Sequence, residues 1–153
     1  ALGDVLLALP GLFIAGVASF AAGHIVAISF YIRHRRAAGA SDWLGAALLL
    51  IMGVAMPPLL TPAGMSFGQT LAYSVLLTGM AASLWLSRFP RLAGLGAIAF
   101  VLSDCIIVLN LGGGKLIGPT TDGALIWGLY FGGQWLIALG VGRGLLARAA
   151  RTS

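Results

Sequence analysis

Charged residues are scarce in this chain. They make up 8% of its 153 residues, while 59% are hydrophobic, and an average soluble domain is about one-quarter charged. This composition excludes an ordinary soluble domain and indicates an integral membrane protein. The net charge is +5, which in a soluble domain would favour a nucleic-acid partner. In a membrane protein, Lys and Arg mostly mark cytoplasmic loops, so we predict no nucleic-acid partner.

Metal-binding residues are also few. Cys105 is the single cysteine, which excludes an intramolecular disulfide and leaves no Cys/His spacing for a structural metal. Catalytic zinc normally takes three protein ligands, and of the two histidines only His24 lies within an apolar run. A hard-metal site made of His24, Asp4 and Asp104 is the alternative. Cys105 is adjacent to Asp104 and therefore points to a different face of a helix, where a packing role is favoured.

Motifs of several common enzyme classes are missing. No G-x-S-x-G elbow of a serine hydrolase is present. The glycines at 112–114 are followed by Lys115 but lack the spacing of a phosphate-binding loop, so they indicate a flexible loop. We predict no cofactor and no metal.

The N-terminal end lacks the features of a signal peptide. There is no basic segment and no initiator Met, and Asp4 interrupts the first apolar run. Pro10 and Gly11 end that run after less than half of the roughly 20 residues that a membrane span needs. We therefore expect a fragment that lacks the first helices of a longer protein.

The apolar runs predict an all-α polytopic transmembrane helix bundle, formed by a single domain over residues 1–153. Ser41 or Asp42 is expected to cap the third helix, and Pro57 and Pro58 to bend or end it. The prediction comprises an N-terminal half-helix and five full spans. These elements cover residues 1–9, 12–32, 42–60, 66–87, 92–111 and 123–146.

Basic residues alternate between the predicted loops. One side of the membrane receives eight arginines, and the other receives only Lys115. The alternation places the C-terminus in the cytoplasm, and a bacterial inner membrane is the expected location. The arginines are Arg33, Arg35, Arg36, Arg88, Arg91, Arg143, Arg148 and Arg151.

Two carboxylates stand inside the predicted membrane helices, Asp4 and Asp104. At about 1.5 Å per residue, each lies about 8 to 10 Å below the non-cytoplasmic end of its helix. An ionisable group at membrane depth is costly unless it faces a bundle interior or a wet cavity, so it indicates a functional site. Two neighbouring buried carboxyl groups do not easily both ionise. The pair thus predicts a general acid beside a carboxylate, as in glycosidases.

Other polar side chains lie within the predicted spans. Tyr130 and Gln134 are four residues apart, and His24 and Tyr31 are seven apart, so each pair shares one helix face. Taken alone, a membrane His or Gln is more often a hydrogen-bond partner between helices than a catalyst. Tyr31 is expected in the aromatic belt at the membrane interface.

Glycines recur at four-residue spacing in the last predicted span, as Gly128 and Gly132 and again as Gly140 and Gly144. Such spacing lets helix backbones approach closely. Packing within the chain is the favoured interpretation, and homodimerisation is the alternative.

These residues resemble a known family. The segments L-P-G-L-F, F-A-A-G-H, G-A-I-A-F-V-L-S-D at 96–104 and Y-F-G-G-Q-W-L-I at 130–137 are similar to the YhhN-like lysoplasmalogenases. The segment between Ser41 and Arg91 matches only in being membrane-spanning. Family members are described with about eight helices, so the resemblance implies that about two and a half helices precede this chain.

The resemblance implies hydrolysis of the vinyl ether bond of lysoplasmalogens, which releases a fatty aldehyde and glycerophospho-ethanolamine or glycerophospho-choline. It also implies that the membrane aspartates are essential, here Asp4 and Asp104. Which aspartate is the acid stays open from the residues, and the apolar neighbours Phe100 and Val101 favour Asp104. The expected partners are a lysophospholipid substrate and membrane lipids.

His24, Tyr130 and Gln134 are expected to hold water or the lipid head group, with Tyr130 nearest to the aspartates. Two other functions remain open from the residues alone. The aspartates could relay protons in a proton-coupled carrier or channel, or they could tie helices together in a scaffold without chemistry.

Overall fold

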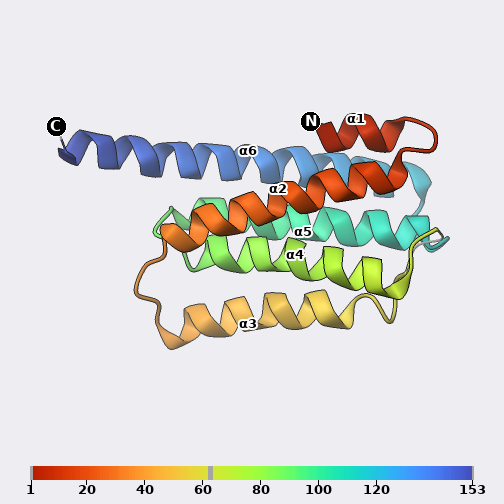
Figure 1. Cartoon of the computed structure of the whole chain (residues 1–153), viewed down its shortest axis with the longest axis horizontal. Coiled ribbons are helices and arrows are strands. Elements are labelled where there is room, and N and C mark those ends of the chain that lie inside the picture. The colour runs from red at the N-terminus through yellow and green to blue at the C-terminus, as the bar shows by residue number, and fades with distance from the viewer. Residues whose placement is uncertain (1, 62–63, 153) are drawn as a thin grey trace.

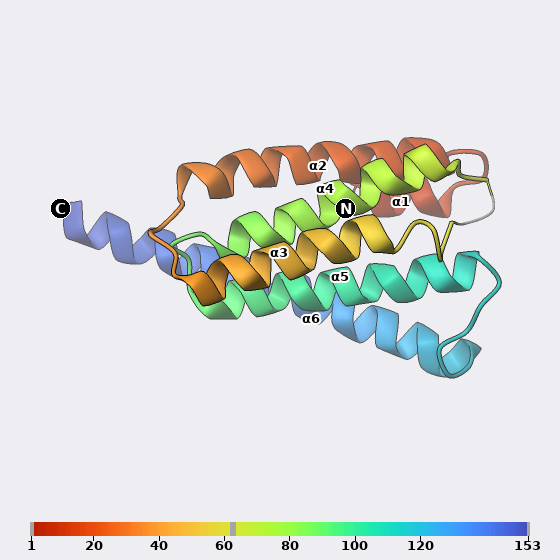
Figure 2. The same cartoon turned by 90° about the horizontal axis from the view of Figure 1, so that it is seen from below.

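The computed structural model describes residues 2–61 and 64–152, and over these residues the chain is all-helical (Figures 1 and 2). Its long helices run roughly parallel or antiparallel in one bundle. This confirms the all-α part of the predicted fold class. The described helices are α1 (Leu2–Ala8), α2 (Phe13–Arg33), α3 (Ala40–Ala55), α4 (Phe67–Trp85), α5 (Arg91–Leu111) and α6 (Pro119–Thr152).

Three described helices are long and apolar enough to cross a membrane, α2, α5 and α6, so the prediction of five full spans is wrong. Helix α3 has only 16 residues, because it ends before Pro57 and Pro58, where a proline cannot continue the hydrogen-bond ladder. Helix α4 is long enough, but polar residues such as Gln69 and Thr70 dilute its apolar character.

Helix boundaries differ from the prediction at two other places. Gly39, not Ser41 or Asp42, precedes the first turn of α3, and the Asp42 carboxylate accepts a hydrogen bond from the Gly39 N–H. Helix α6 begins at Pro119, a favoured first residue of a helix, and its 34 residues extend beyond both ends of the predicted span 123–146. At α4, Ser66 and Gln69 form a reciprocal capping box, close to the predicted start.

The tight turn after α1 folds that helix back onto α2 (Figure 1). Gly11 has a φ of 76°, which a glycine adopts without strain. Gly3 lies against the ring of Phe20, and Gly16 lies against Leu7, with no room for a side chain at either glycine. These contacts fix the position of α1, and with it Asp4, against α2.

Helices α4 and α5 form the centre of the bundle. Helix α4 packs against α2, α3 and α5, and α5 also packs against α6. The core contains the fully buried side chains of Leu84, Phe100 and Val101. The site described below lies next to this core.

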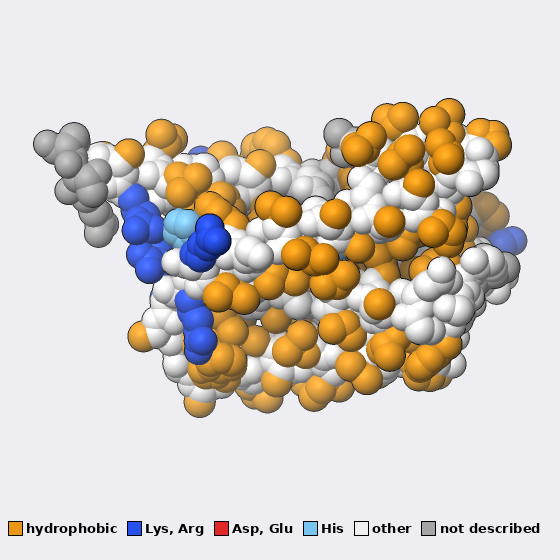
Figure 3. Space-filling view, viewed as in Figure 1, with side chains coloured by type: hydrophobic (Ala, Val, Ile, Leu, Met, Phe, Trp, Pro, Cys, Tyr) orange, Lys and Arg blue, Asp and Glu red, His pale blue; other side chains and the backbone are white. Residues whose placement is uncertain are grey.

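Most of the basic side chains visible in Figure 3 gather at one end of the bundle, while blue also shows at the opposite end, and apolar side chains cover the visible face between the ends. Asp42 joins two segments there, because it accepts hydrogen bonds from Arg36, at 2.7 Å, and from Arg91. We call this end, which carries Arg33, Arg35, Arg36, Arg88 and Arg91, the basic end. The predicted alternation of loop charges is thus present in the fold.

Glycines bring α5 and α6 into backbone contact. A Cβ atom on Gly133 would lie 2.6 Å from the carbonyl oxygen of Gly96, and one on Gly96 would lie 2.6 Å from that of Gly133. Gly140 and Gly144 likewise pack against α5 and the loop before it. Side chains added at Gly128 and Gly132 would meet no other described residue within 4 Å, and both glycines are exposed. The favoured interpretation, packing within the chain, therefore does not hold for this pair, and homodimerisation remains the alternative.

Two neighbouring glycines of α6 test this packing. We expect Gly133→Ala to destabilise the protein by about 1 to 3 kcal/mol, because the added methyl group has no space against Gly96. Gly132→Ala meets open space and should be neutral or slightly stabilising, since alanine favours helix. Thermal unfolding of the purified variants in detergent measures both, and equal shifts would contradict the backbone contact.

Candidate functional site

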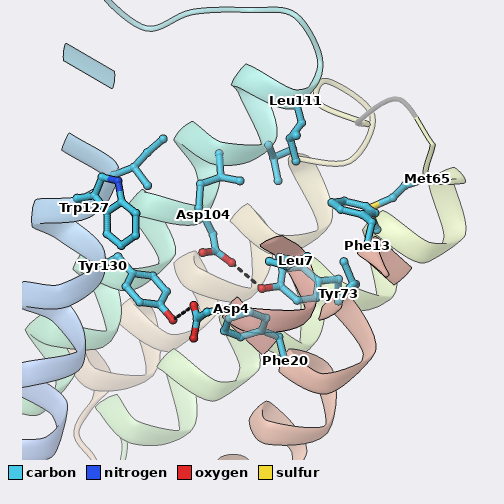
Figure 4. A pocket seen from close by; sticks show the side chains of 14 residues that line it. Asp4, Leu7, Phe13, Phe20, Met65, Tyr73, Asp104, Leu111, Trp127 and Tyr130 are labelled. Atoms are coloured by element: carbon cyan, nitrogen blue, oxygen red, sulfur yellow. Dashed lines mark hydrogen bonds between the residues drawn. The ribbon is translucent and has the colours of Figure 1, made fainter. Parts of the chain in front are cut away.

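Asp4 and Asp104 line the same cavity, of about 200 Å³ (Figure 4). The two aspartates are 100 residues apart and come from α1 and α5. Both carboxyl groups point into the space between the helices. The structure therefore brings together the two residues that the sequence analysis paired, while their roles stay a prediction.

Asp104 is nearly enclosed, with 7% of its surface exposed. The hydroxyl of Tyr73, on α4, donates a hydrogen bond of 2.7 Å to its Oδ2 atom. Its other oxygen, Oδ1, has no hydrogen-bond partner among the described residues. A buried carboxyl group needs such a donor, because an unsatisfied polar group is costly in an apolar interior. Tyr73 therefore holds Asp104 in position and leaves one oxygen available to a ligand.

Asp4 lies at the exposed edge of the cavity. The hydroxyl of Tyr130, on α6, donates a hydrogen bond of 2.6 Å to its Oδ1 atom. The ring of Tyr130 packs against Phe100 of α5. Each aspartate thus has its own tyrosine donor, and the two tyrosines come from different helices.

The rest of the cavity wall is almost entirely apolar. It extends from the aspartates toward the end of the bundle opposite the basic end, because Phe13, Met65 and Leu111 lie at or beside the helix ends there. Trp127 forms part of the same wall (Figure 4). The shape and lining suit an alkyl chain whose polar end lies near the carboxyl groups. The remaining apolar wall residues are Leu7, Val17, Phe20, Ile107, Val108 and Ile126.

His24 and Gln134 do not join the aspartates. They line a second cavity of about 280 Å³, which also contains Tyr31. Of the three predicted binding residues, only Tyr130 lies in the first cavity. Tyr31 is 6% exposed and packs against Phe30 and Phe89, so its predicted place in an exposed aromatic belt is wrong.

Cys105 takes no part in the first cavity. Its Sγ atom lies 3.1 Å from the Sδ atom of Met56, a packing contact between α5 and the residue after α3. Asp122, which is fully buried, accepts hydrogen bonds from the N–H groups of Leu116, Ile117 and Gly118. It orders the loop before α6 rather than contributing to the cavity.

The sequence analysis did not identify Tyr73. A signal was available, because Tyr73 lies well inside a predicted span, where a tyrosine hydroxyl needs a partner. What could not be read from the sequence is that this partner is Asp104, since the pairing depends on how α4 and α5 pack.

The fold and the site define an all-helical membrane protein with an apolar cavity that carries two aspartates beside two tyrosines. The family model of the YhhN family matches residues 1–141, and the chain belongs to this family, the family of lysoplasmalogenases. No curated protein and no solved structure matches the chain. The resemblance found in the sequence is thereby confirmed at the level of the family.

The hydrogen bond between Tyr73 and Asp104 can be tested by removing one hydroxyl group. We expect Tyr73→Phe to lower the free energy of unfolding by about 1 to 3 kcal/mol, because Asp104 Oδ2 loses its donor in a buried place. Tyr31→Phe is the matched control, since the Tyr31 hydroxyl makes no hydrogen bond among the described residues, and should have a smaller effect. Denaturant unfolding in detergent compares them, and an equal loss in both variants would contradict the role of Tyr73.

Proposed function

We propose that this protein hydrolyses the vinyl ether bond of lysoplasmalogens to a fatty aldehyde and glycerophospho-ethanolamine or glycerophospho-choline. The observation that carries the proposal is an apolar cavity lined by both Asp4 and Asp104, each of which accepts a hydrogen bond from a tyrosine hydroxyl. Membership of the YhhN family supports it.

A vinyl ether requires little of an enzyme beyond a proton donor and a stabilising anion. Protonation of the carbon β to the ether oxygen produces an oxocarbenium ion, which a carboxylate stabilises. The adjoining alkenyl chain needs an apolar surface, and the cavity wall beyond the aspartates supplies it.

We assign Asp104 as the acid, because its side chain is nearly enclosed and a charge is costly in such a place. Its carboxyl O–H bond breaks as a C–H bond forms on the alkenyl chain. Asp4, at the exposed edge of the cavity, is the carboxylate that stabilises the cation and takes a proton from the attacking water. The new C–O bond gives a hemiacetal.

The hemiacetal then collapses with the proton transfers reversed. Asp4 returns its proton to the ether oxygen as that C–O bond breaks, and the hemiacetal hydroxyl gives its proton to Asp104. Aldehyde and alcohol leave, and both carboxyl groups regain their starting states. Tyr73 and Tyr130 are positioning residues in this scheme, because their hydroxyl groups orient the two carboxyl groups.

We further propose that the basic end faces the cytoplasm. Its arginines support this orientation, because Lys and Arg are enriched in the cytoplasmic loops of membrane proteins. Helix α6 ends on the same side (Figure 1), so the C-terminus is proposed to be cytoplasmic.

Aldehyde release tests the proposed reaction. We expect the purified protein to release fatty aldehyde from a lysoplasmalogen, and Asp4→Asn and Asp104→Asn each to lower the rate by at least about 100-fold, the contribution of a general acid or base. Asparagine keeps an oxygen that can accept the tyrosine hydrogen bond but cannot exchange the proton. Aldehyde is measured by coupling to an aldehyde-dependent dehydrogenase.

Asp42→Asn is the matched control, because Asp42 lies at the basic end and bonds to arginines rather than lining the cavity. It should retain the wild-type rate per folded molecule. No aldehyde from the wild type would refute the hydrolase, and full activity in both cavity variants would refute the mechanism.

A further inference from the structure

The second cavity differs in chemistry from the first. Its walls come from α1, α2, α4, α5 and α6, and Gln134 is exposed, which leaves the cavity open at the surface near α6. It contains four polar side chains, none of them an Asp, Glu, Lys or Arg. These four are Ser19, His24, Tyr31 and Gln134.

His24 is the buried polar group of this cavity. It is 6% exposed, and its ring contacts the rings of Phe20, Tyr73 and Phe100. Its Nε2 atom is buried and has no hydrogen-bond partner in the part of the chain that the structure describes. Native structures rarely leave such an atom unsatisfied, so the unpaired nitrogen of a residue that lines a cavity points to a partner bound in that cavity.

The two cavities share part of their walls close to the aspartates. Phe20 lines both of them. In α1, Gly3 lines the second cavity and the next residue, Asp4, lines the first. Phe100 packs against His24 on one side and against Tyr130 on the other. A molecule that occupies both cavities would therefore pass beside the aspartates.

We propose that the second cavity binds the glycerol part of the lysolipid through its free sn-2 hydroxyl group, while the alkenyl chain occupies the first cavity. This inference rests on the proposed function. Imidazole, amide and hydroxyl groups suit a neutral hydroxylated group, whereas a phosphate would call for a cation that the described wall does not contain. His24 Nε2 is the atom that the sn-2 hydroxyl satisfies.

The arrangement fixes the direction of the bound lipid. Tyr31 and Ala27 place the second cavity toward the basic end of α2, and Phe13 and Leu111 place the first toward the opposite end. The glycerol thus faces the basic end and the chain faces away from it. The phosphate, which follows the glycerol, lies on the side where the arginines gather.

Binding of an uncleavable substrate analogue tests the inference without relying on catalysis. The probe is a radiolabelled 1-alkyl lysophosphatidylcholine, whose saturated ether is not a vinyl ether. Its competitor is the matching 2-deoxy lipid, which lacks only the sn-2 hydroxyl. We expect the wild type to bind the hydroxyl-bearing lipid about three- to tenfold more tightly, the size of one net hydrogen bond.

Two variants test whether residues of the second cavity cause the preference for the hydroxyl-bearing lipid. His24→Phe keeps an aromatic ring among Phe20, Tyr73 and Phe100 but removes the nitrogen, so we expect the affinity ratio to fall to about one. Gln134→Leu changes an exposed residue of the same cavity, should fold normally and should lower the ratio in part. Ser29→Ala, on the exposed side of α2, is the control and should leave the ratio unchanged.

The outcomes separate this inference from the proposed function. Equal binding of the two lipids by the wild type, or an unchanged ratio in both His24→Phe and Gln134→Leu, would overturn the glycerol site even if aldehyde is released. A preference that His24→Phe or Gln134→Leu removes would support the site even if no aldehyde is found. If His24→Phe does not fold, Gln134→Leu alone decides.

Discussion

The contact between the backbones of Gly96 and Gly133 determines where the site forms. Without side chains at these positions, α5 and α6 approach until each glycine lies against the other's carbonyl oxygen. Tyr130 is almost one turn before Gly133 on α6, so the same contact places its ring on Phe100 and its hydroxyl beside Asp4. A wider spacing between α5 and α6 would separate Tyr130 from α1.

The site also depends on how each carboxyl group is accommodated in an apolar surrounding. Asp104 is enclosed and has a donor from α4, whereas Asp4 lies at the exposed edge and has a donor from α6. These unequal environments are what an acid and its carboxylate partner require. The two cavities also differ in their linings. The side chains of the second cavity suit a hydroxylated group, whereas those of the first suit a hydrocarbon chain.

Local sequence signals predicted the helices well but not their lengths at every point. Pro10 with Gly11 ended α1 as expected, and α4 begins one residue after its predicted start at residue 66. Helix α3 is shorter than expected because its backbone leaves the helix before the prolines, and α6 is longer because it begins at Pro119 and continues to Thr152. The predicted number of membrane spans was too high, because a span must be both long enough and apolar enough to cross the membrane. Helix α3 is too short, and α4 is not apolar enough.

The sequence by itself determined the membrane class, the helical architecture, the family and the positions of Asp4 and Asp104 along their helices. These are properties of one segment at a time, because rise per residue and hydropathy do not depend on neighbouring helices. Only the tertiary structure decided that Tyr73 pairs with Asp104, that Tyr130 pairs with Asp4, and that His24 and Gln134 lie in a separate cavity. The rotation of one helix against another follows from close packing at glycines and aromatic rings, which no single helix encodes.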